Sequence, residues 1–141
     1  MGTVFKAFDP LLTRVVAVKV ISAQLDSYPE HRERFFREAR AAAKLSHRNI
    51  ITIHDLGEQE GSPFLAMEYL EGRDLEQRMR DAEGMSLARK LELAMSVAEG
   101  LAHAHACGLI HRDIKPANIF VSDDGGVKSS TSVWPAWSRP R

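Results

Sequence analysis

The sequence contains a single cysteine, Cys107, among its 141 residues, so no disulfide framework can form within the chain. A lone thiol fits a reducing compartment, and we expect a cytoplasmic protein. The sequence also lacks an apolar run near the roughly 20 residues that cross a bilayer, and it opens without a signal-peptide pattern. Its 19 basic and 19 acidic residues cancel, which favours neither nucleic acid nor a membrane surface as a partner.

Hydrophobic periodicity predicts short strands followed by longer helices. Strands are expected at Val4–Phe8, Val15–Ile21, Ile50–Leu56, Phe64–Tyr69 and Ile119–Val121. Helices are expected at Pro29–Leu45, Asp74–Arg80 and Ser86–Ala106, with Asp74 and Ser86 as N-caps. Because strands crowd the first half of the chain and helices the second, we expect an α+β fold in two layers or lobes.

Two of these elements carry more detailed expectations. The strands at 50–56 and 64–69 flank a polar segment, which predicts a turn over residues 57–63. The helix at 86–106 has an apolar face that we expect to be buried, formed by Leu87, Leu91, Ala94, Val97, Ala98 and Leu101.

One short stretch combines polar residues that serve phosphoryl transfer, His111-Arg112-Asp113-Ile114-Lys115-Pro116-Ala117-Asn118. Asp113 is placed to accept a hydroxyl proton, Lys115 to neutralise phosphate charge, and the Asn118 carbonyl oxygen to ligate Mg²⁺. Several polar identities agree at fixed offsets, which a chance match does not explain. The loop resembles that of the protein kinases, and its wording resembles the bacterial kinases of the serine/threonine branch.

This resemblance implies a two-lobed kinase fold that binds ATP with Mg²⁺ and phosphorylates Ser or Thr of a protein substrate. It covers residues 1–128, from the middle of a Gly-rich loop to just before the family's metal-binding Asp. We therefore expect a truncated domain, with a small-lobe sheet that lacks its first strand and with the start of the helical lobe.

The resemblance also implies nucleotide contacts near the N-terminus. Gly2 and Val4 match the last glycine and the following valine of the Gly-rich loop, where backbone approaches the phosphates and Val covers the adenine. Lys19 lies inside a β-branched strand, where burial requires an anion, and should contact the α- and β-phosphates. Ala17 would pack on the adenine ring. Glu38 is the implied ion partner of Lys19, although alone it would be an ordinary solvated helix charge.

The segment Met67-Glu68-Tyr69-Leu70-Glu71-Gly72 resembles the hinge between kinase lobes. By this resemblance Met67 is the gatekeeper, and backbone groups of Glu68 and Leu70 hydrogen-bond the adenine edge. Asp74 could reach the ribose hydroxyls. Capping of the following helix is an equally good interpretation of Asp74, and the two roles are compatible.

The resemblance ends after Lys128. Where the family has Asp-Phe-Gly, whose Asp holds Mg²⁺, this chain has Ser129-Ser130-Thr131-Ser132-Val133-Trp134-Pro135, and no Asp or Glu follows Asp124. With one nucleotide restored, the codons of that run can encode Ile-Leu-Asp-Phe-Gly-Leu-Ala. We therefore expect residues 129–141 to be a non-homologous, frameshifted tail. Without the Asp, phosphate charge is poorly neutralised, so we expect negligible kinase activity and marginal stability.

Two other functions fit parts of the sequence. A pseudokinase-like remnant that binds nucleotide without catalysis is favoured by the missing metal-binding Asp and opposed by the intact Lys19, Asp113 and Asn118. A small-molecule phosphotransferase on a related fold is favoured less, because Arg112 and Lys115 within the loop are typical of protein kinases.

Overall fold

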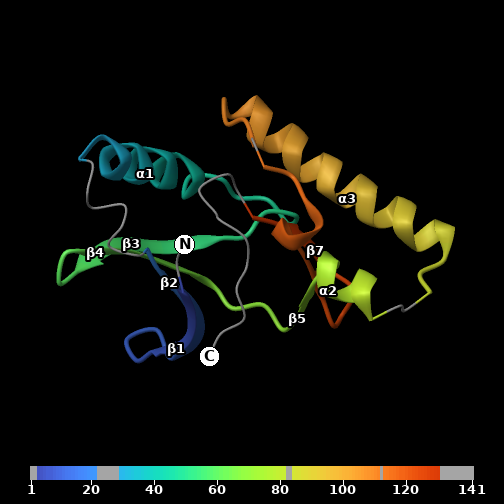
Figure 1. Cartoon of the computed structure of the whole chain (residues 1–141), viewed down its shortest axis with the longest axis horizontal. Helices are drawn as coiled ribbons and strands as arrows, with labels where there is room; N and C mark the ends of the chain where they lie inside the picture. The colour runs from blue at the N-terminus through green and yellow to red at the C-terminus, as the bar shows by residue number, and fades with distance from the viewer. Residues whose placement is uncertain (1–2, 22–28, 82–83, 112, 131–141) are drawn as a thin grey trace.

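The computed structural model describes residues 3–21, 29–81, 84–111 and 113–130. Its elements are β1 (Thr3–Asp9), β2 (Arg14–Val20), α1 (Pro29–Ala42), β3 (Ile53–Gln59), β4 (Ser62–Glu68), β5 (Gly72–Asp74), α2 (Leu75–Arg80), α3 (Leu87–Ala106), η2 (Pro116–Asn118), β6 (Ile119–Ser122) and β7 (Val127–Ser129). They form a four-stranded sheet near α1 and a three-stranded sheet near α3 (Figure 1). The expected α+β arrangement in two lobes is confirmed.

The four-stranded sheet has the order β1-β2-β4-β3, with all neighbours antiparallel. Its β3–β4 hairpin is tighter than expected, since Gln59 already pairs with Ser62. The two residues between them, Glu60 and Gly61, have φ values of 51° and 78°, as a two-residue turn requires. The strand expected at 50–56 therefore begins and ends three residues later in the structure. The turn starts at Glu60, and a glutamate gives no sequence signal of a left-handed backbone.

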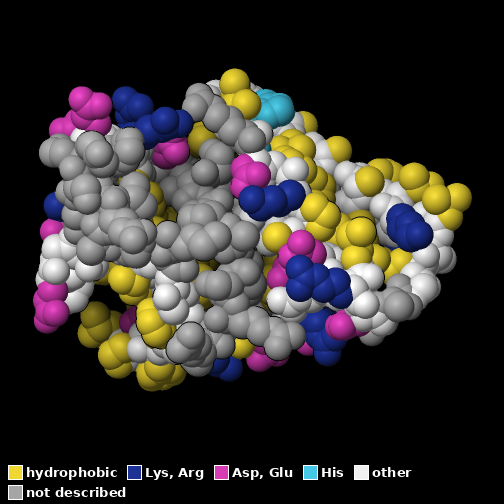
Figure 2. All heavy atoms as spheres, in the orientation of Figure 1, with side chains coloured by type: hydrophobic (Ala, Val, Ile, Leu, Met, Phe, Trp, Pro, Cys, Tyr) yellow, Lys and Arg dark blue, Asp and Glu magenta, His cyan; other side chains and the backbone are white. Residues whose placement is uncertain are grey.

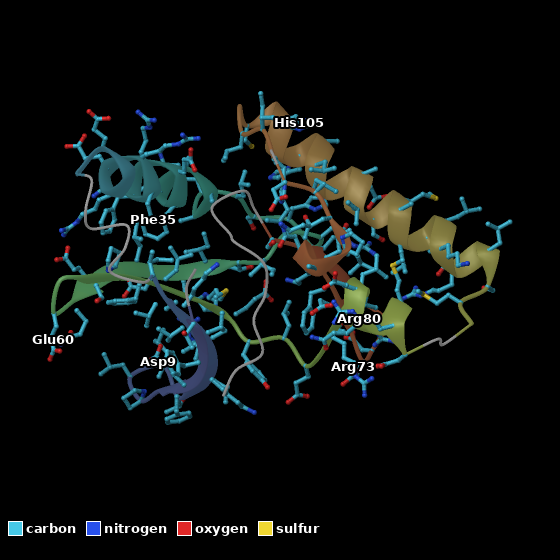
Figure 3. All side chains as sticks on the ribbon, in the orientation of Figure 1. Asp9, Phe35, Glu60, Arg73, Arg80 and His105 are labelled. Carbon is cyan, nitrogen blue, oxygen red and sulfur yellow. The ribbon has the colours of Figure 1, made fainter. Side chains whose placement is uncertain are left out.

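Helix α1 covers one face of this sheet and closes its core. The buried cluster consists of Val4, Ala17, Ala39, Ala42, Ile51, Ile53, Leu65 and Met67. Phe35 adds its ring between α1 and the sheet (Figure 3). The helix ends at Ala42 rather than at the expected Leu45, because the Leu45 amide donates to the Ala42 carbonyl (3.0 Å) and the last turn tightens.

Helix α3 packs on the three-stranded sheet through a face that shares only Val97 and Leu101 with the one expected. Its buried residues are Leu93, Val97, Gly100 and Ala104. Val97 belongs to the expected face, but Leu87 and Leu91 are 73% and 56% exposed, and Figure 2 shows hydrophobic side chains at the surface over α3. The helix carries apolar residues on more than one side, so periodicity alone does not select the side that meets the sheet.

The expected helix caps are confirmed. Asp74 Oδ1 accepts from the Gln77 amide (2.7 Å) and Ser86 Oγ from the Arg89 amide (3.2 Å). Strands β5 and β7 were not expected, because three residues are too few for a pattern to emerge. No helix among the described residues combines the length and apolar character that crossing a membrane requires.

Candidate active site

Two of the four predicted catalytic residues, Asp113 and Lys115, and the predicted metal ligand Asn118 lie in the segment between α3 and β6, whereas the other two, Lys19 and Glu38, lie in β2 and α1. Pro116 starts the single turn η2, and the Asn118 amide donates to the Lys115 carbonyl (2.9 Å). This turn brings the Asn118 side chain back onto Asp113, where its Nδ2 donates to the Asp113 carbonyl (2.7 Å) and to Oδ2 (3.0 Å). A local turn thus brings together residues that are five positions apart.

Asp113 and Lys115 form an ion pair in this loop, with 2.6 Å between Oδ2 and Nζ. The hydrogen bond from Lys115, and then the one from Asn118, hold the pKa of the Asp113 carboxyl below its usual value. The two side chains are 45% and 43% exposed. The carboxylate is therefore ionised at neutral pH and open to an approaching hydroxyl group.

The second polar atom of Asn118 has no hydrogen-bond partner within the described part of the chain. Its Oδ1 is buried, which is costly for an acceptor unless something else binds it. An amide oxygen is a hard ligand of the kind that Mg²⁺ prefers. The described residues contain no cluster of three His, Cys, Asp or Glu that could hold a metal alone. Asn118 therefore fits a cation whose other ligands come from water and phosphate.

His111 holds the start of the loop in place. Its Nδ1 accepts from the Asp113 amide (3.2 Å), and its Nε2 donates to the Ser130 carbonyl. Burial lowers the pKa of His111, while the Ser130 bond and the charge of Asp113 act in the opposite direction. The imidazole is thus neutral and structural. Its neighbour Arg112 lies outside the described residues.

Lys19 lies in β2 between Val4 of β1 and Leu65 of β4. It is 2% exposed, and burial lowers its pKa to about 7 because the ammonium loses its water. Val4 and Ala17 are each 1% exposed and belong to the same core as Met67. The sheet thus gathers most residues predicted for the nucleotide, while Gly2 lies outside the described residues.

Glu38 occupies the predicted helix but has a local partner. Its Oε1 lies 2.9 Å from Arg34 Nε, one turn earlier in α1, and the two side chains are 31% and 54% exposed. In this structure Glu38 is therefore paired within its own helix. Its ion pair with Lys19 stays a prediction.

The predicted hinge, residues 67–72, begins within the last two residues of β4 and ends at the first residue of β5. Met67 is fully buried, and Leu70 is partly buried against the same core. The Glu68 amide donates to the Thr52 carbonyl (3.0 Å), which leaves the Glu68 carbonyl as its backbone group for an adenine edge. Asp74 uses Oδ1 as a helix cap, so its contact with a ribose stays a prediction.

Sequence reasoning missed the contribution of the residues that follow the loop. Ser129 and Ser130 are 3% and 5% exposed. The Ser129 amide donates to the Asn49 carbonyl (2.8 Å), and the Ser130 amide to the Asn118 carbonyl (3.0 Å). The Ser129 and Ser130 hydroxyls donate to the same two carbonyls (3.1 and 3.2 Å). Serines in a polar segment are common, so no motif in the sequence signals these contacts. They fix β7 beside the loop that carries Asn118.

Comparison with known proteins places these features in context. A family model described as "Protein kinase domain" matches residues 1–130. Serine/threonine-protein kinase PknJ of Mycobacterium tuberculosis is 44% identical over 126 residues, which cover 89% of this chain and 21% of the relative. Serine/threonine-protein kinase PksC of Streptomyces coelicolor is 39% identical over 136 residues, covering 91% and 24%. The chain spans about a fifth of the length of the curated relatives it matches.

Solved structures show the same likeness in three dimensions. The crystal structure of the PknI kinase domain of M. tuberculosis superposes with a TM-score of 0.86 at 34% sequence identity. The superposition covers 99% of this chain and 55% of that one. A variant of the same domain matches with a TM-score of 0.82 at 35% identity. The described fold thus corresponds to more than half of a known domain.

Proposed function

Because this chain belongs to the protein kinase family, of the serine/threonine type, we propose that its site binds ATP with Mg²⁺ and directs the γ-phosphoryl group to a Ser or Thr hydroxyl of a protein. One observation carries this proposal. A single loop holds an ionised carboxylate, an ammonium group 2.6 Å from it, and a buried carbonyl oxygen without a described partner. These are the acid–base, charge-neutralising and metal-ligating groups that phosphoryl transfer requires.

Asp113 and Lys115 would divide the work at the reacting atoms. The Asp113 carboxylate is exposed and ionised, so it can orient a substrate hydroxyl and accept its proton. Lys115 would then turn from this carboxylate toward the phosphoryl oxygens and neutralise the charge in transfer. Such catalysis rests on position and electrostatics, and both groups lie in the short segment just before η2, where Asn118 holds Asp113.

Asn118 would hold Mg²⁺ through Oδ1, and its Nδ2 would remain on Asp113. When bound, the ion would neutralise charge on the phosphate oxygens. One side chain would therefore orient both the base and the metal. This explains why a buried amide, rather than an apolar residue, occupies the position.

Lys19 would meet the α- and β-phosphates, whose negative charge would favour the protonated form of this buried lysine. Glu38 would exchange Arg34 for Lys19 when nucleotide binds, since the Arg34 pair is exposed and weak. The remaining nucleotide contacts are proposed for Gly2, Val4, Ala17, Met67, Glu68, Leu70 and Asp74.

We propose further that this chain binds nucleotide better than it turns it over. No acidic residue follows Asp124, so residues 129–141 contain no carboxylate that could share the metal with the Asn118 amide. The frameshift proposed for this tail is tested by resequencing the DNA around codons 128 and 129. We also propose a cytoplasmic location, because Cys107 carries an exposed free thiol.

The test compares the 141-residue chain with its Asp113→Asn variant, which keeps the size of the side chain. We expect ATP with Mg²⁺ to raise the unfolding temperature of both, with negligible transfer of labelled phosphate to a basic protein. No stabilisation by ATP would refute the nucleotide site. Transfer that is lost in Asp113→Asn would support the catalytic roles and refute the inactivity. Transfer to small alcohols instead would favour a small-molecule phosphotransferase.

A further inference from the structure

An ion pair joins the two sheets behind the proposed nucleotide site. Glu68 is the last residue of β4, and Lys128 is the middle residue of β7. Their Oε1 and Nζ atoms lie 2.6 Å apart, and the side chains are 22% and 25% exposed. Both line a hollow of about 520 Å³ that also includes Tyr69 and Leu70 of the hinge. The pair is thus shielded on most sides, unlike the surface pairs of α1 and α2.

The Glu68 carboxylate is held from a second direction. The same Oε1 accepts from the Thr52 amide (2.6 Å), while the Glu68 amide donates to the Thr52 carbonyl (3.0 Å). Because a backbone amide already fixes the carboxylate, the Glu68 side chain loses less conformational entropy when it pairs with Lys128. Glu68 is therefore prepositioned for Lys128 rather than free to sample solvent.

The segment that holds Glu68 also holds β7. Asn49 Nδ2 donates to the Val127 carbonyl (2.8 Å), and the Ile51 amide donates to the Ser129 carbonyl (3.1 Å). Three segments are thus tied together, namely the end of β4, residues 49–52 and β7. The Glu68–Lys128 pair is the direct side-chain link among the described contacts between the hinge and β7.

The position of this link matters for a ligand that spans the site. On one side, Glu68 leads straight into the hinge proposed to bind adenine. On the other, β7 pairs with β6, and Ser130 after it bonds to the carbonyl of Asn118, the proposed metal ligand. The link therefore acts, together with the hydrogen bonds of residues 49–52, on the spacing between the base contact and the metal contact.

We propose that Glu68 and Lys128 are positioning residues whose ion pair holds the hinge and the metal-binding loop at the spacing that ATP with Mg²⁺ requires. This inference rests on the proposed function. It gives the Glu68 side chain a role that hinge backbone contacts alone do not. A preorganised spacing strengthens the binding of a ligand that touches both sides, and it leaves a ligand that touches only the hinge unaffected.

The experiment measures the dissociation constants of ATP with Mg²⁺ and of adenosine for the 141-residue chain and its variants, by calorimetry. Lys128→Met and Glu68→Gln each break the pair, and the glutamine can still accept from Thr52. We expect each to weaken ATP binding about fivefold and to leave adenosine binding within about twofold. The double variant should bind ATP no more weakly than either single variant. Lys128→Arg keeps the charge and should bind ATP like the unaltered chain.

The two single variants change the net charge in opposite directions, which separates positioning from simple attraction. If Lys128→Met weakens ATP binding and Glu68→Gln strengthens it, long-range electrostatics explains the data and the inference is wrong. Lys44→Met removes an exposed charge that takes part in neither sheet, on the turn after α1. Its effect on ATP binding measures how much a change in net charge alone contributes. Equal weakening of ATP binding and adenosine binding would also overturn the inference, because a merely structural role of the pair predicts that result.

Failure of the proposed function would look different. If the unaltered chain binds neither ligand, the nucleotide site itself is refuted. If Lys128→Met does not fold, Glu68→Gln still decides the question, since it removes the charge of the pair and keeps the size of the side chain. Unfolding temperatures of all variants are recorded alongside the affinities.

Discussion

Replacing Lys19 with Met should stabilise the chain without nucleotide and abolish nucleotide binding. Lys19 is 2% exposed, and burial lowers its pKa from the ordinary 10.5 to about 7. Methionine has a similar length and no charge to desolvate. A gain in stability together with a loss of function is what a residue maintained for its ligand should show.

The magnitude follows from proton linkage. The gap between a pKa of 10.5 in the unfolded chain and about 7 in the folded chain corresponds to roughly 5 kcal/mol, the upper limit of the gain. Below pH 7 the lysine is charged in both the folded and the unfolded chain, so Lys19→Met gains the full stability difference. Between pH 7 and 10.5 the unfolded chain binds a proton that the folded chain has lost. The unaltered chain therefore gains about 1.4 kcal/mol per pH unit, and the advantage of the variant shrinks.

The assay is urea unfolding followed by circular dichroism at pH 6, 8 and 10. Other titrating groups are common to both chains and cancel in the difference. Lys44→Met serves as the control, because its exposed side chain should show no such pH dependence. A Lys19→Met variant that is less stable than the parent at pH 6, or a difference that does not change with pH, would refute the reasoning.

Three further predictions concern the fold and the metal ligand. Leu93→Ala should lower the free energy of unfolding by about 2–4 kcal/mol, since Leu93 is 4% exposed, whereas Met95→Ala, at a 63% exposed position of the same helix, should change it by less than about 0.5 kcal/mol. Gly72→Ala should cost about 2 kcal/mol or more in urea unfolding, because φ is 143° and the new Cβ would lie 2.4 Å from the Val121 carbonyl oxygen. Asn118→Ala should weaken ATP binding at least about tenfold in Mg²⁺ and much less in EDTA, as calorimetry would show; equal effects in both buffers would contradict its role as a metal ligand.

The catalytic loop was predictable because its chemistry is local. Asp113 and Asn118 are five residues apart, and a single turn that begins at Pro116 is enough to join them. The chain carries both the residue types and the short path between them. Residue identity at fixed offsets therefore predicts proximity here without any knowledge of the tertiary structure.

The pair of Lys19 and Glu38 shows where such reasoning stops. Its formation depends on how α1 sits against the sheet, and Arg34 competes from one helical turn away. A partner at i−4 is available whatever the tertiary arrangement, whereas Lys19 must be brought there by packing. The sequence can name both partners of Glu38, but the choice between them depends on tertiary packing and on bound nucleotide.

The segment after Lys128 separates the requirements of fold from those of chemistry. Composition predicts that residues 129–141 are foreign to the family, yet the family model matches through residue 130, Ser129 completes β7 and Ser130 bonds to Asn118. A β-ladder uses amide and carbonyl groups that every residue except proline supplies, so small hydroxyl side chains can take the place of apolar ones at the cost of core packing. A carboxylate for the metal has no such substitute. A chain of this sequence can therefore keep the frame of the site while it lacks a group that phosphoryl transfer requires.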